Sequence, residues 1–313
     1  TDKEFIEIAK IRNLVNHDCI DHPDEDKNNW EIRDKSKIRD RLLLYENKKL
    51  IGLLYYTQGR GENNQTSFFN ILINPKYNNN GFREMLYQEM LNQVKCFECN
   101  QLYSNVYEHT NYKRYHQFLI KHNFKLVQIN REYSCDIKQI NTKKYQYLIK
   151  KLESEGIKFY DSKTQMLDWL NHYKKLEELH WVLDQDIPHP DGIKPTRLPF
   201  EQWEKVVLDF YNNSYGVEII AVKNGDYIGA TDIEIFPKSE PHKGWTGGLG
   251  VIREFRRKGI ATILKIKAIE ALLKKDITEI RTDNEENNPM YKINEALGFE
   301  PVPFSLEYMK KLV

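Results

Sequence analysis

The stretch VIREFRRKGIATIL, residues 251–264, joins an apolar pair to three cations, a glycine and an apolar-periodic segment. The cations are Arg256, Arg257 and Lys258, and the glycine is Gly259. This order predicts a strand that enters a tight turn and opens a helix. Such a turn directs several backbone N–H groups at one point, where the helix dipole adds partial positive charge. The stretch therefore predicts an anion site suited to phosphate.

The residue types at this turn favour a pyrophosphate as the anion. Gly259 lets the backbone approach a bulky group, Ala261 keeps the first helical turn small, and the three cations supply full charges. The chain has no G-x-x-x-x-G-K-[ST] loop, and no G-x-G-x-x-G follows a strand. The alternative is a solvated basic cap before an ordinary helix.

The composition excludes several classes of protein. The 313 residues include 47 basic and 46 acidic side chains, so a net charge of +1 gives no overall attraction to nucleic acid or an anionic membrane. The mean hydropathy of -0.70 and the lack of an apolar run near the ~18 residues of a bilayer span predict a soluble protein. The charged first residues, TDKEFIEIAK, do not resemble a signal peptide, so we expect a cytoplasmic location.

The four cysteines do not indicate a metal site. Cys96 and Cys99 form a C-x-x-C, but no second ligand pair follows at matching spacing. Free thiols in a reducing compartment are the simpler interpretation, and we expect no metal.

The order of predicted elements repeats along the chain. Periodicity and turn signals predict the first set as a helix at 3–15, two strands within 41–58, a strand at 67–75, a helix at 81–94, a strand at 101–108, a helix at 112–123 and a strand at 125–137. They predict the second set as helices at 143–156, 164–183 and 201–211, a strand at 157–161, a hairpin at 218–236, a strand at 244–252, a helix after Gly259, a strand at 277–282 and a helix at 288–297.

Three landmarks support an internal duplication. Gly52 precedes Gly81 by 29 residues, and Gly229 precedes Gly259 by 30. A phenylalanine follows the last helix of each half, 43 residues after Gly81 and 40 after Gly259. We therefore predict two copies of one α/β domain, at residues 1–139 and 140–313.

A second motif follows the strand at 277–282. The run TDNEENNPMYKINEALGF contains Asn284, Asn287, Met290, Asn294 and the triplet 297–299. Together with the R-x-x-G-x-A turn, it resembles the GNAT acyltransferase superfamily. The two motifs cover about residues 246–300 and are separated by one helix and one strand.

This resemblance implies a fold and a cosubstrate. The fold is α/β, with two tandem domains that each have a mixed, mostly antiparallel sheet flanked by helices. In the second domain the sheet splays open between parallel strands at 246–252 and 277–282 to admit acetyl-CoA, and the glycines at 247, 248 and 250 suit a bulged strand there. The implied cofactor-binding residues are Gly250, Val251, Ile252, Arg256, Arg257, Lys258, Gly259, Ile260, Ala261, Asn284 and Asn287.

The first half departs from this pattern. It has NNNGFR at 78–83, so Arg83 stands where the family has a small residue, and HNF replaces LGF with Asn111 as counterpart of Asn287. We expect this half to bind CoA poorly or not at all and to act structurally. Tandem proteins with one degenerate copy include enzymes similar to mycothiol synthase.

Acetyl transfer to an amine requires a base, an oxyanion site and an acid for the thiolate. The backbone near Val251 would form the oxyanion site. Asp232 and Glu234 share one face of their strand, and Asp232 is our candidate base; a solvated surface carboxylate is the alternative. For the acid, the position of the family tyrosine is Asn294, which has no proton to release, so Tyr291 or solvent would substitute.

The sequence predicts an N-acetyltransferase that acts on the amine of a small molecule, with a non-catalytic acyl-CoA sensor as the alternative. Three carboxylates in the loop at 184–199, Asp184, Asp186 and Asp191, would suit a cationic acceptor. We expect no nucleic-acid or membrane partner and either a monomer or a homodimer. The identity of the acceptor does not follow from the sequence.

Overall fold

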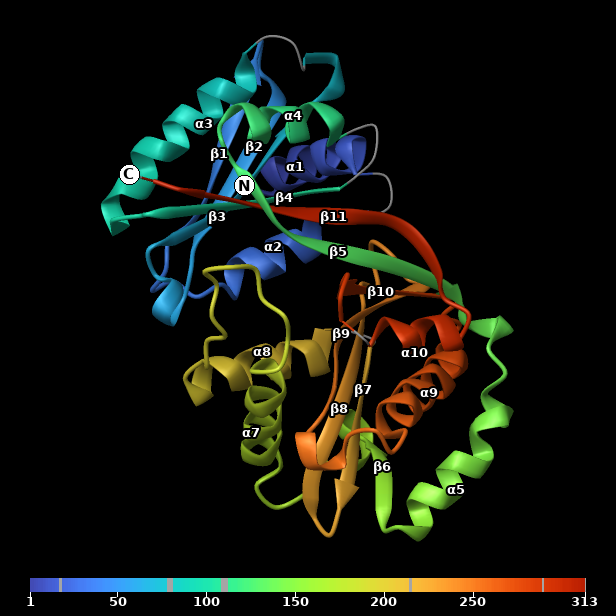
Figure 1. The fold of residues 1–313 in the computed structure, drawn as a ribbon. Coiled ribbons are helices and arrows are strands. Elements are labelled where there is room, and N and C mark those ends of the chain that lie inside the picture. Colours follow the sequence, from blue (N-terminus) through green and yellow to red (C-terminus); the bar gives the residue numbers. More distant parts are fainter. Residues whose placement is uncertain (17–18, 78–80, 108–111, 214–215, 289, 313) are drawn as a thin grey trace. The chain divides into compact units, whose positions relative to one another are not determined.

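A computed structural model describes residues 1–313 except 17–18, 78–80, 108–111, 214–215, 289 and 313 (Figure 1). The chain forms two compact units. Unit 1 consists of Thr1–Arg131, His189–Thr196 and Pro303–Val313, and unit 2 of Glu132–Pro188 and Arg197–Val302. The fold is α/β, with mostly antiparallel strand pairing and flanking helices, as predicted.

Unit 1 contains four α-helices among its described residues: α1 (Asp2–Val15), α2 (Pro23–Glu31), α3 (Phe82–Gln93) and α4 (Lys113–Lys121). Its strands are β1 (Arg39–Glu46), β2 (Lys49–Gln58), β3 (Thr66–Ile73), β4 (Gln101–Tyr107), the first part of β5 (Lys125–Asp136) and most of β11 (Glu300–Lys311). The strand order is β1-β2-β3-β4-β11, and helices α1, α3 and α4 pack with the sheet in one apolar core.

Unit 2 repeats this plan. Its helices are α5 (Gln146–Ser154), α6 (Ser162–Gln165), α7 (His172–Asp184), α8 (Phe200–Asn213), α9 (Ile260–Leu272) and α10 (Tyr291–Ala296). Its strands are β6 (Ile157–Asp161), β7 (Val217–Lys223), β8 (Asp226–Ile235), β9 (Lys243–Val251) and β10 (Glu279–Glu285), in the order β10-β9-β8-β7-β6, with the end of β5 next to β10.

The two faces of the unit 2 sheet carry different cores. Alternate residues such as Ile219 and Ile233 pack with α9, whereas Ile220 and Ala230 pack with α7 and α8. Figure 1 shows α9 and α10 on one side of these strands and α7 and α8 on the other. Successive side chains along β7 or β8 therefore face α9 and the α7–α8 pair in alternation.

The strand pairings confirm the internal duplication. In unit 1, β1, β2 and β3 pair antiparallel and β4 pairs parallel to β3; in unit 2, β7, β8 and β9 pair antiparallel and β10 pairs parallel to β9. In each unit, the helix that follows the third antiparallel strand begins after a glycine with positive φ. These glycines are Gly81, at +72° before α3, and Gly259, at +86° before α9.

The chain does not divide into two consecutive blocks. β5 runs from unit 1 into unit 2 between Arg131 and Glu132, and β11 returns to unit 1 between Val302 and Pro303. There β11 pairs antiparallel with β4 over seven residue pairs, from Ser305 with Tyr107 to Lys311 with Gln101 (Figure 1). The contact units thus differ from the predicted blocks, 1–139 and 140–313, because the C-terminal strand completes the first sheet.

Most predicted elements are present, and three differ. The helix predicted at 164–183 is broken into α6 and α7, which residues 166–171 separate, and Asn171 takes a left-handed conformation with φ +58° directly before α7. Helix α2 and strand β11 were not predicted. The predicted hairpin turn is present, with positive φ at both Asn224 and Gly225.

Candidate functional site

The glycine turn of unit 2 presents the first turn of α9. Gly259 is the N-cap of this helix, and the amide of Ile263 donates to its carbonyl at 3.1 Å. The three preceding amides, at 260–262, belong to the helical turn that has no intrahelical acceptor. The φ of +86° at Gly259 favours glycine, and a Cβ there would lie 2.8 Å from Cδ2 of Leu148 in α5, so this side chain would have to shift. The turn has the geometry of an anion site.

Two basic side chains near this turn, Arg253 and Arg256, contact a carboxylate. Arg256 donates from Nε to the carbonyl of Val251 at 2.8 Å, and its Nη2 pairs with Asp186. Arg253 donates from Nε to Asp186 Oδ1 at 3.1 Å. The hydrogen bond from Arg253, with that from Arg256, holds the pKa of Asp186 below its usual value. Arg257 and Lys258 are exposed.

Two of the loop aspartates have defined contacts. Asp186 binds the arginines near the anion turn. The backbone carbonyl of Asp191, a residue of unit 1, accepts a hydrogen bond from the Tyr103 hydroxyl. The suitability of the loop carboxylates for a cationic acceptor stays a prediction.

Strands β9 and β10 splay apart where the sequence predicted. Their parallel pairing covers three residue pairs and ends at Trp245 with Arg281. Beyond this point β9 continues to Val251 and β10 to Glu285. The hydroxyl of Thr246, the next residue of β9, is buried without a hydrogen-bond partner among the described residues. The opening thus offers backbone and hydroxyl groups to an extended amide-containing chain.

The opposite edge of β9 has a bulge that accommodates Asp232. Asp232 pairs with Gly248 and Ile233 with Thr246, so Gly247 is the extra residue, and the predicted bulge is confirmed. A Cβ on Gly247 would lie 2.0 Å from Asp232 Oδ2, and one on Gly248 would lie 3.1 Å from Oδ1. The carboxylate therefore lies against the backbone of the strand that lines the opening.

The surroundings of Asp232 favour its protonated form. It lies on the face of β8 that packs with α7 and α8, half-buried, whereas Ile233 faces α9. Burial and the negative charge of Glu218, its partner on β7, raise the pKa of Asp232 to about 7, although His180 opposes this shift. A carboxylate with this pKa can accept a proton near neutral pH.

Glu218 remains ionised at the centre of a buried network. Its Oε1 lies 2.9 Å from His180 Nε2, and its Oε2 accepts from the hydroxyls of Ser162 at 2.7 Å and Tyr211 at 2.6 Å. Burial favours the neutral acid, but the His180 hydrogen bond and charge, with the two hydroxyls, hold the pKa of Glu218 below its usual value. The site therefore pairs one carboxylate held ionised with one that readily binds a proton.

The predicted acid position, Asn294, belongs to a second buried network. Lys265 of α9 donates from Nζ to Asn294 Oδ1 at 2.5 Å, and Asn294 donates from Nδ2 to Asn284 Oδ1 at 2.8 Å. Burial lowers the pKa of Lys265 to about 7. The structure thus joins Asn284, on the splayed end of β10, to Asn294. Tyr291 is half-buried at the first residue of α10, and Asn287 is exposed and bonds Glu285.

The repeat identifies the positions in unit 1 that correspond to the carboxylate pair. Gly52 and Gly229 each pair with the residue eight positions before the turn glycine of their unit. Three residues after these glycines stand Tyr55 in unit 1 and Asp232 in unit 2, so these two positions are equivalent. Their partners on the preceding strand, Arg41 for Tyr55 and Glu218 for Asp232, are therefore equivalent as well.

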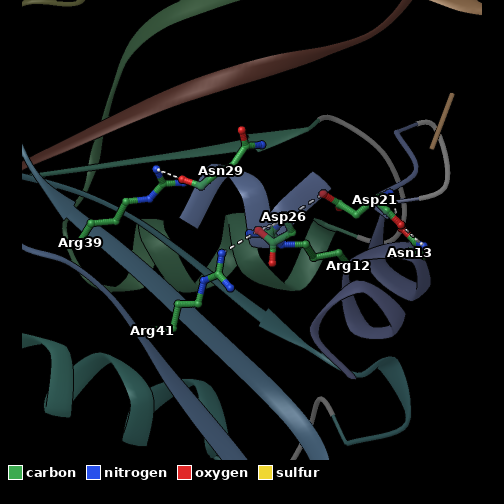
Figure 2. Close-up of polar contacts among 7 residues, drawn as sticks. All are labelled: Arg12, Asn13, Asp21, Asp26, Asn29, Arg39 and Arg41. Carbon is green, nitrogen blue, oxygen red and sulfur yellow. Dashed lines mark hydrogen bonds and ion pairs between the residues drawn. The ribbon is translucent and has the colours of Figure 1, made fainter. Parts of the chain in front are cut away.

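Unit 1 therefore carries the opposite charge at the position of Glu218. Arg41 donates from Nη2 to Asp26 Oδ1 at 2.6 Å, and Arg12 reaches the same oxygen at 3.2 Å and Asp21 at 3.1 Å (Figure 2). The side chains of Arg41 and Asp26 are 8% and 5% exposed, so this pair is buried. Tyr55 has no carboxylate with which to accept a proton.

The turn of unit 1 also differs from that of unit 2. The guanidinium of Arg83 lies 5.5 Å from the ring centre of Tyr115 and 5.9 Å from that of Phe118. Burial lowers its pKa to about 10. Residues 78–80 and Asn111, which entered the sequence comparison of the two halves, lie outside the described residues.

Three residues of the site were not predicted: Glu218, His180 and Lys265. Glu218 is the one charged residue within the apolar run VEIIAV, and Lys265 interrupts the apolar face of IATILKIKAI. A charge within an otherwise buried segment was therefore a usable signal. The contact of His180 with Glu218 had no local signal, because 38 residues separate them in the chain.

The described part of the chain has neither a membrane-spanning helix nor a cluster of metal ligands. None of the helices in this part of the chain is long and apolar enough to cross a bilayer. Within the same residues, no group of three or more His, Cys, Asp or Glu side chains is arranged to hold a metal ion.

Comparison with known proteins supports the fold. Residues 174–299 match the acetyltransferase (GNAT) family. The whole chain is similar in structure to a tandem GNAT protein from the clavulanic acid biosynthesis pathway, with a TM-score of 0.77, 16% identity, and 99% of this chain and 95% of that chain covered. A GCN5-related N-acetyltransferase from Sphaerobacter thermophilus has a TM-score of 0.69 and 15% identity over 99% and 93% of the two chains. No curated protein sequence matches the chain.

Proposed function

We propose that unit 2 transfers an acetyl group from acetyl-CoA to the amine of a small molecule, because residues 174–299 match the acetyltransferase (GNAT) family. One observation carries this proposal: the Asp232 carboxylate lies against the β9 bulge, beside the opening between β9 and β10. The proton acceptor Asp232 thus lies against the same short segment of β9 whose other edge, which we call the thioester edge, would bind the acetyl thioester.

The residues of unit 2 fit the coenzyme. The amides of the first turn of α9 and the side chains of Arg256, Arg257 and Lys258 would hold the pyrophosphate. The backbone of β9 near Gly250 and Val251, with the unpartnered Thr246 hydroxyl, would hold the pantetheine arm. Bound there, acetyl-CoA supplies an activated acyl group to the α7–α8 face of the sheet.

Asp232 would act as the general base. It accepts a proton from the acceptor ammonium, directly or through water, so that the amine nitrogen can bond the acyl carbon. Backbone amides near Val251 stabilise the oxyanion that develops as this carbon–nitrogen bond forms and that reverts to a carbonyl as the carbon–sulfur bond breaks. We propose Tyr291 as the proton donor to the departing thiolate, since Asn294 has no acidic proton and is bound to Lys265 and Asn284.

We propose that unit 1 does not transfer acetyl groups. Arg83 occupies the first turn of its equivalent helix and packs on aromatic rings, and Tyr55 and Arg41 replace the carboxylate pair. A cationic amine would meet a buried arginine there. The cytoplasmic location and the choice between monomer and homodimer stay predictions from the sequence.

Thiol release from acetyl-CoA with a panel of small amines tests the function. We expect turnover with at least one cationic amine, and a fall of about 10²-fold or more in kcat for Asp232→Asn. Asp226→Asn, at the exposed start of the same strand, is the matched control and should keep wild-type kcat. Binding of acetyl-CoA without turnover on any amine would instead favour an acyl-CoA sensor, the alternative that Asn294 at the acid position supports.

A further inference from the structure

The buried carboxylate of Glu218 does not contact the proposed thioester edge, yet it lies directly across the strand pair from Asp232. Both residues point to the α7–α8 face, since they are register partners on adjacent antiparallel strands. Three donors from three elements surround Glu218: His180 on α7, Tyr211 on α8 and Ser162 at the start of α6. Both oxygens of this anion are thus hydrogen-bonded, and its side chain is 3% exposed.

The fold itself does not require an anion at this position. The equivalent residue of unit 1 is Arg41, buried and paired with Asp26 (Figure 2). A buried charge of either sign is costly unless it is paired, so a sign that differs between two copies of one fold reflects their different sites. In unit 1 the residue opposite Arg41 is Tyr55, whose phenol is neutral near pH 7.

We propose that Glu218 is a positioning residue of the transfer reaction, whose fixed negative charge across the β7–β8 pair keeps Asp232 ready to take a proton from the acceptor at neutral pH. The inference rests on the proposed function of Asp232. Glu218 acts through Asp232 and exchanges no proton, because its three donors hold it ionised. The raised pKa of Asp232, about 7, agrees with this arrangement.

Other charges near Asp232 modify the effect without reversing it. His180 contributes positive charge from α7 and offsets part of the influence of Glu218, and Asp184 on the same helix acts on His180. Glu234, two residues along β8, adds a smaller negative contribution. From β9 only backbone faces the carboxylate, through the amide of Gly248.

The pH dependence of kcat/KM for the amine tests the proposal. In the wild type we expect the acidic limb near pH 7, because protonated Asp232 cannot accept a proton. Glu218→Gln should move this limb to lower pH by about one unit, since a neighbouring negative charge is lost. Glu177→Gln is the matched control: Glu177 is a buried glutamate of α7 that pairs with Arg197, and the limb should stay in place.

A charge-preserving variant separates charge from packing. Glu218→Asp keeps the anion, so its acidic limb should stay near that of the wild type even if kcat falls. An unchanged limb in Glu218→Gln, or an equal downward shift in Glu218→Asp, would overturn the proposal.

A direct titration separates this inference from the proposed function. The side-chain carboxyl carbon of Asp232, assigned by loss of its NMR signal in Asp232→Asn, should titrate at lower pH in Glu218→Gln than in the wild type. If no amine is acetylated but this shift is present, the function of the site is wrong and the coupling is correct. If amines are acetylated and the carboxyl titrates identically in both proteins, the coupling is wrong.

Discussion

At the scale of single residues, the bulge glycine of β9 makes the proposed base possible. A Cβ at position 247 would lie 2.0 Å from Asp232 Oδ2, which is too close for any real contact. Gly247→Ala must therefore displace the carboxylate or the strand, and we expect a loss of about 1–3 kcal/mol in the free energy of unfolding. Urea unfolding of Gly247→Ala, alone and combined with Asp232→Ala, measures this loss.

The control for this clash is a change at the other partner. In an Asp232→Ala background the oxygen is absent, so Gly247→Ala should cost much less than in the wild type. Equal costs in the two backgrounds would show that the alanine conflicts with something other than Asp232.

A second residue, Lys265, should make stability depend on pH. Burial lowers its pKa from 10.5 to about 7, so between these values the unfolded chain binds more protons than the folded one, and stability rises with pH. Below about pH 7 the folded protein carries the buried charge at full cost. Lys265→Met should therefore be more stable than the wild type at low pH, with the difference shrinking as pH rises from 7 to 10.5.

Unfolding free energies of the two proteins at a series of pH values check this expectation. Lys267→Met, two residues along the same helix with a half-buried side chain that pairs with Glu270, is the control. A difference between Lys265→Met and the wild type that does not vary with pH would contradict it.

At the scale of elements, the two glycine turns provide a matched pair. Gly259 and Gly81 both have positive φ, so alanine at either position should destabilise the protein by about 1 kcal/mol. Only Gly259 opens the helix that we propose binds pyrophosphate, and its Cβ would also press on Leu148. Gly259→Ala should thus weaken acetyl-CoA binding about tenfold or more, whereas Gly81→Ala should leave it unchanged.

Calorimetric titration with acetyl-CoA measures both affinities. Equal weakening by the two substitutions would place the binding site elsewhere or in both units. No heat with the wild type would remove the coenzyme from the proposal altogether.

At the scale of the whole molecule, the C-terminal strand links the stability of unit 1 to the end of the chain. Tyr308 is 3% exposed in the unit 1 core, and its hydroxyl lies 3.0 Å from His116 Nδ1. Tyr308→Ala should cost about 3–5 kcal/mol and loosen unit 1 first, because the cavity opens in its core. Hydrogen exchange resolved by residue should show that Tyr308→Ala accelerates exchange, relative to the wild type, more in β4 than in β8.

Tyr147→Ala is the control, since this side chain is 81% exposed on α5. It should change neither the stability nor the exchange pattern. Faster exchange confined to unit 2 in Tyr308→Ala would contradict the assignment of β11 to the first sheet.

Elements that depend on local signals could be predicted from the amino-acid sequence alone. The turn at Gly259, the hairpin at Asn224–Gly225 and the bulge near Gly247 follow from glycines and polar residues that permit those backbone conformations. Spacing between glycines was enough to identify the duplication. The motif around Asn284 and Asn294 indicated a resemblance to the GNAT family, and residues 174–299 match the model of that family.

Contacts between residues far apart in the chain became known only from the folded structure. The strand β11 was not predicted because Pro301 and Pro303 interrupt its alternating pattern, and its place beside β4 depends on pairing across about 200 residues. The Glu218 network likewise unites four segments that share no local pattern, and Asp186 turned out to bind Arg253. Pairing and burial are nonlocal, because a side chain's charge and exposure depend on whichever strands and helices pack around it.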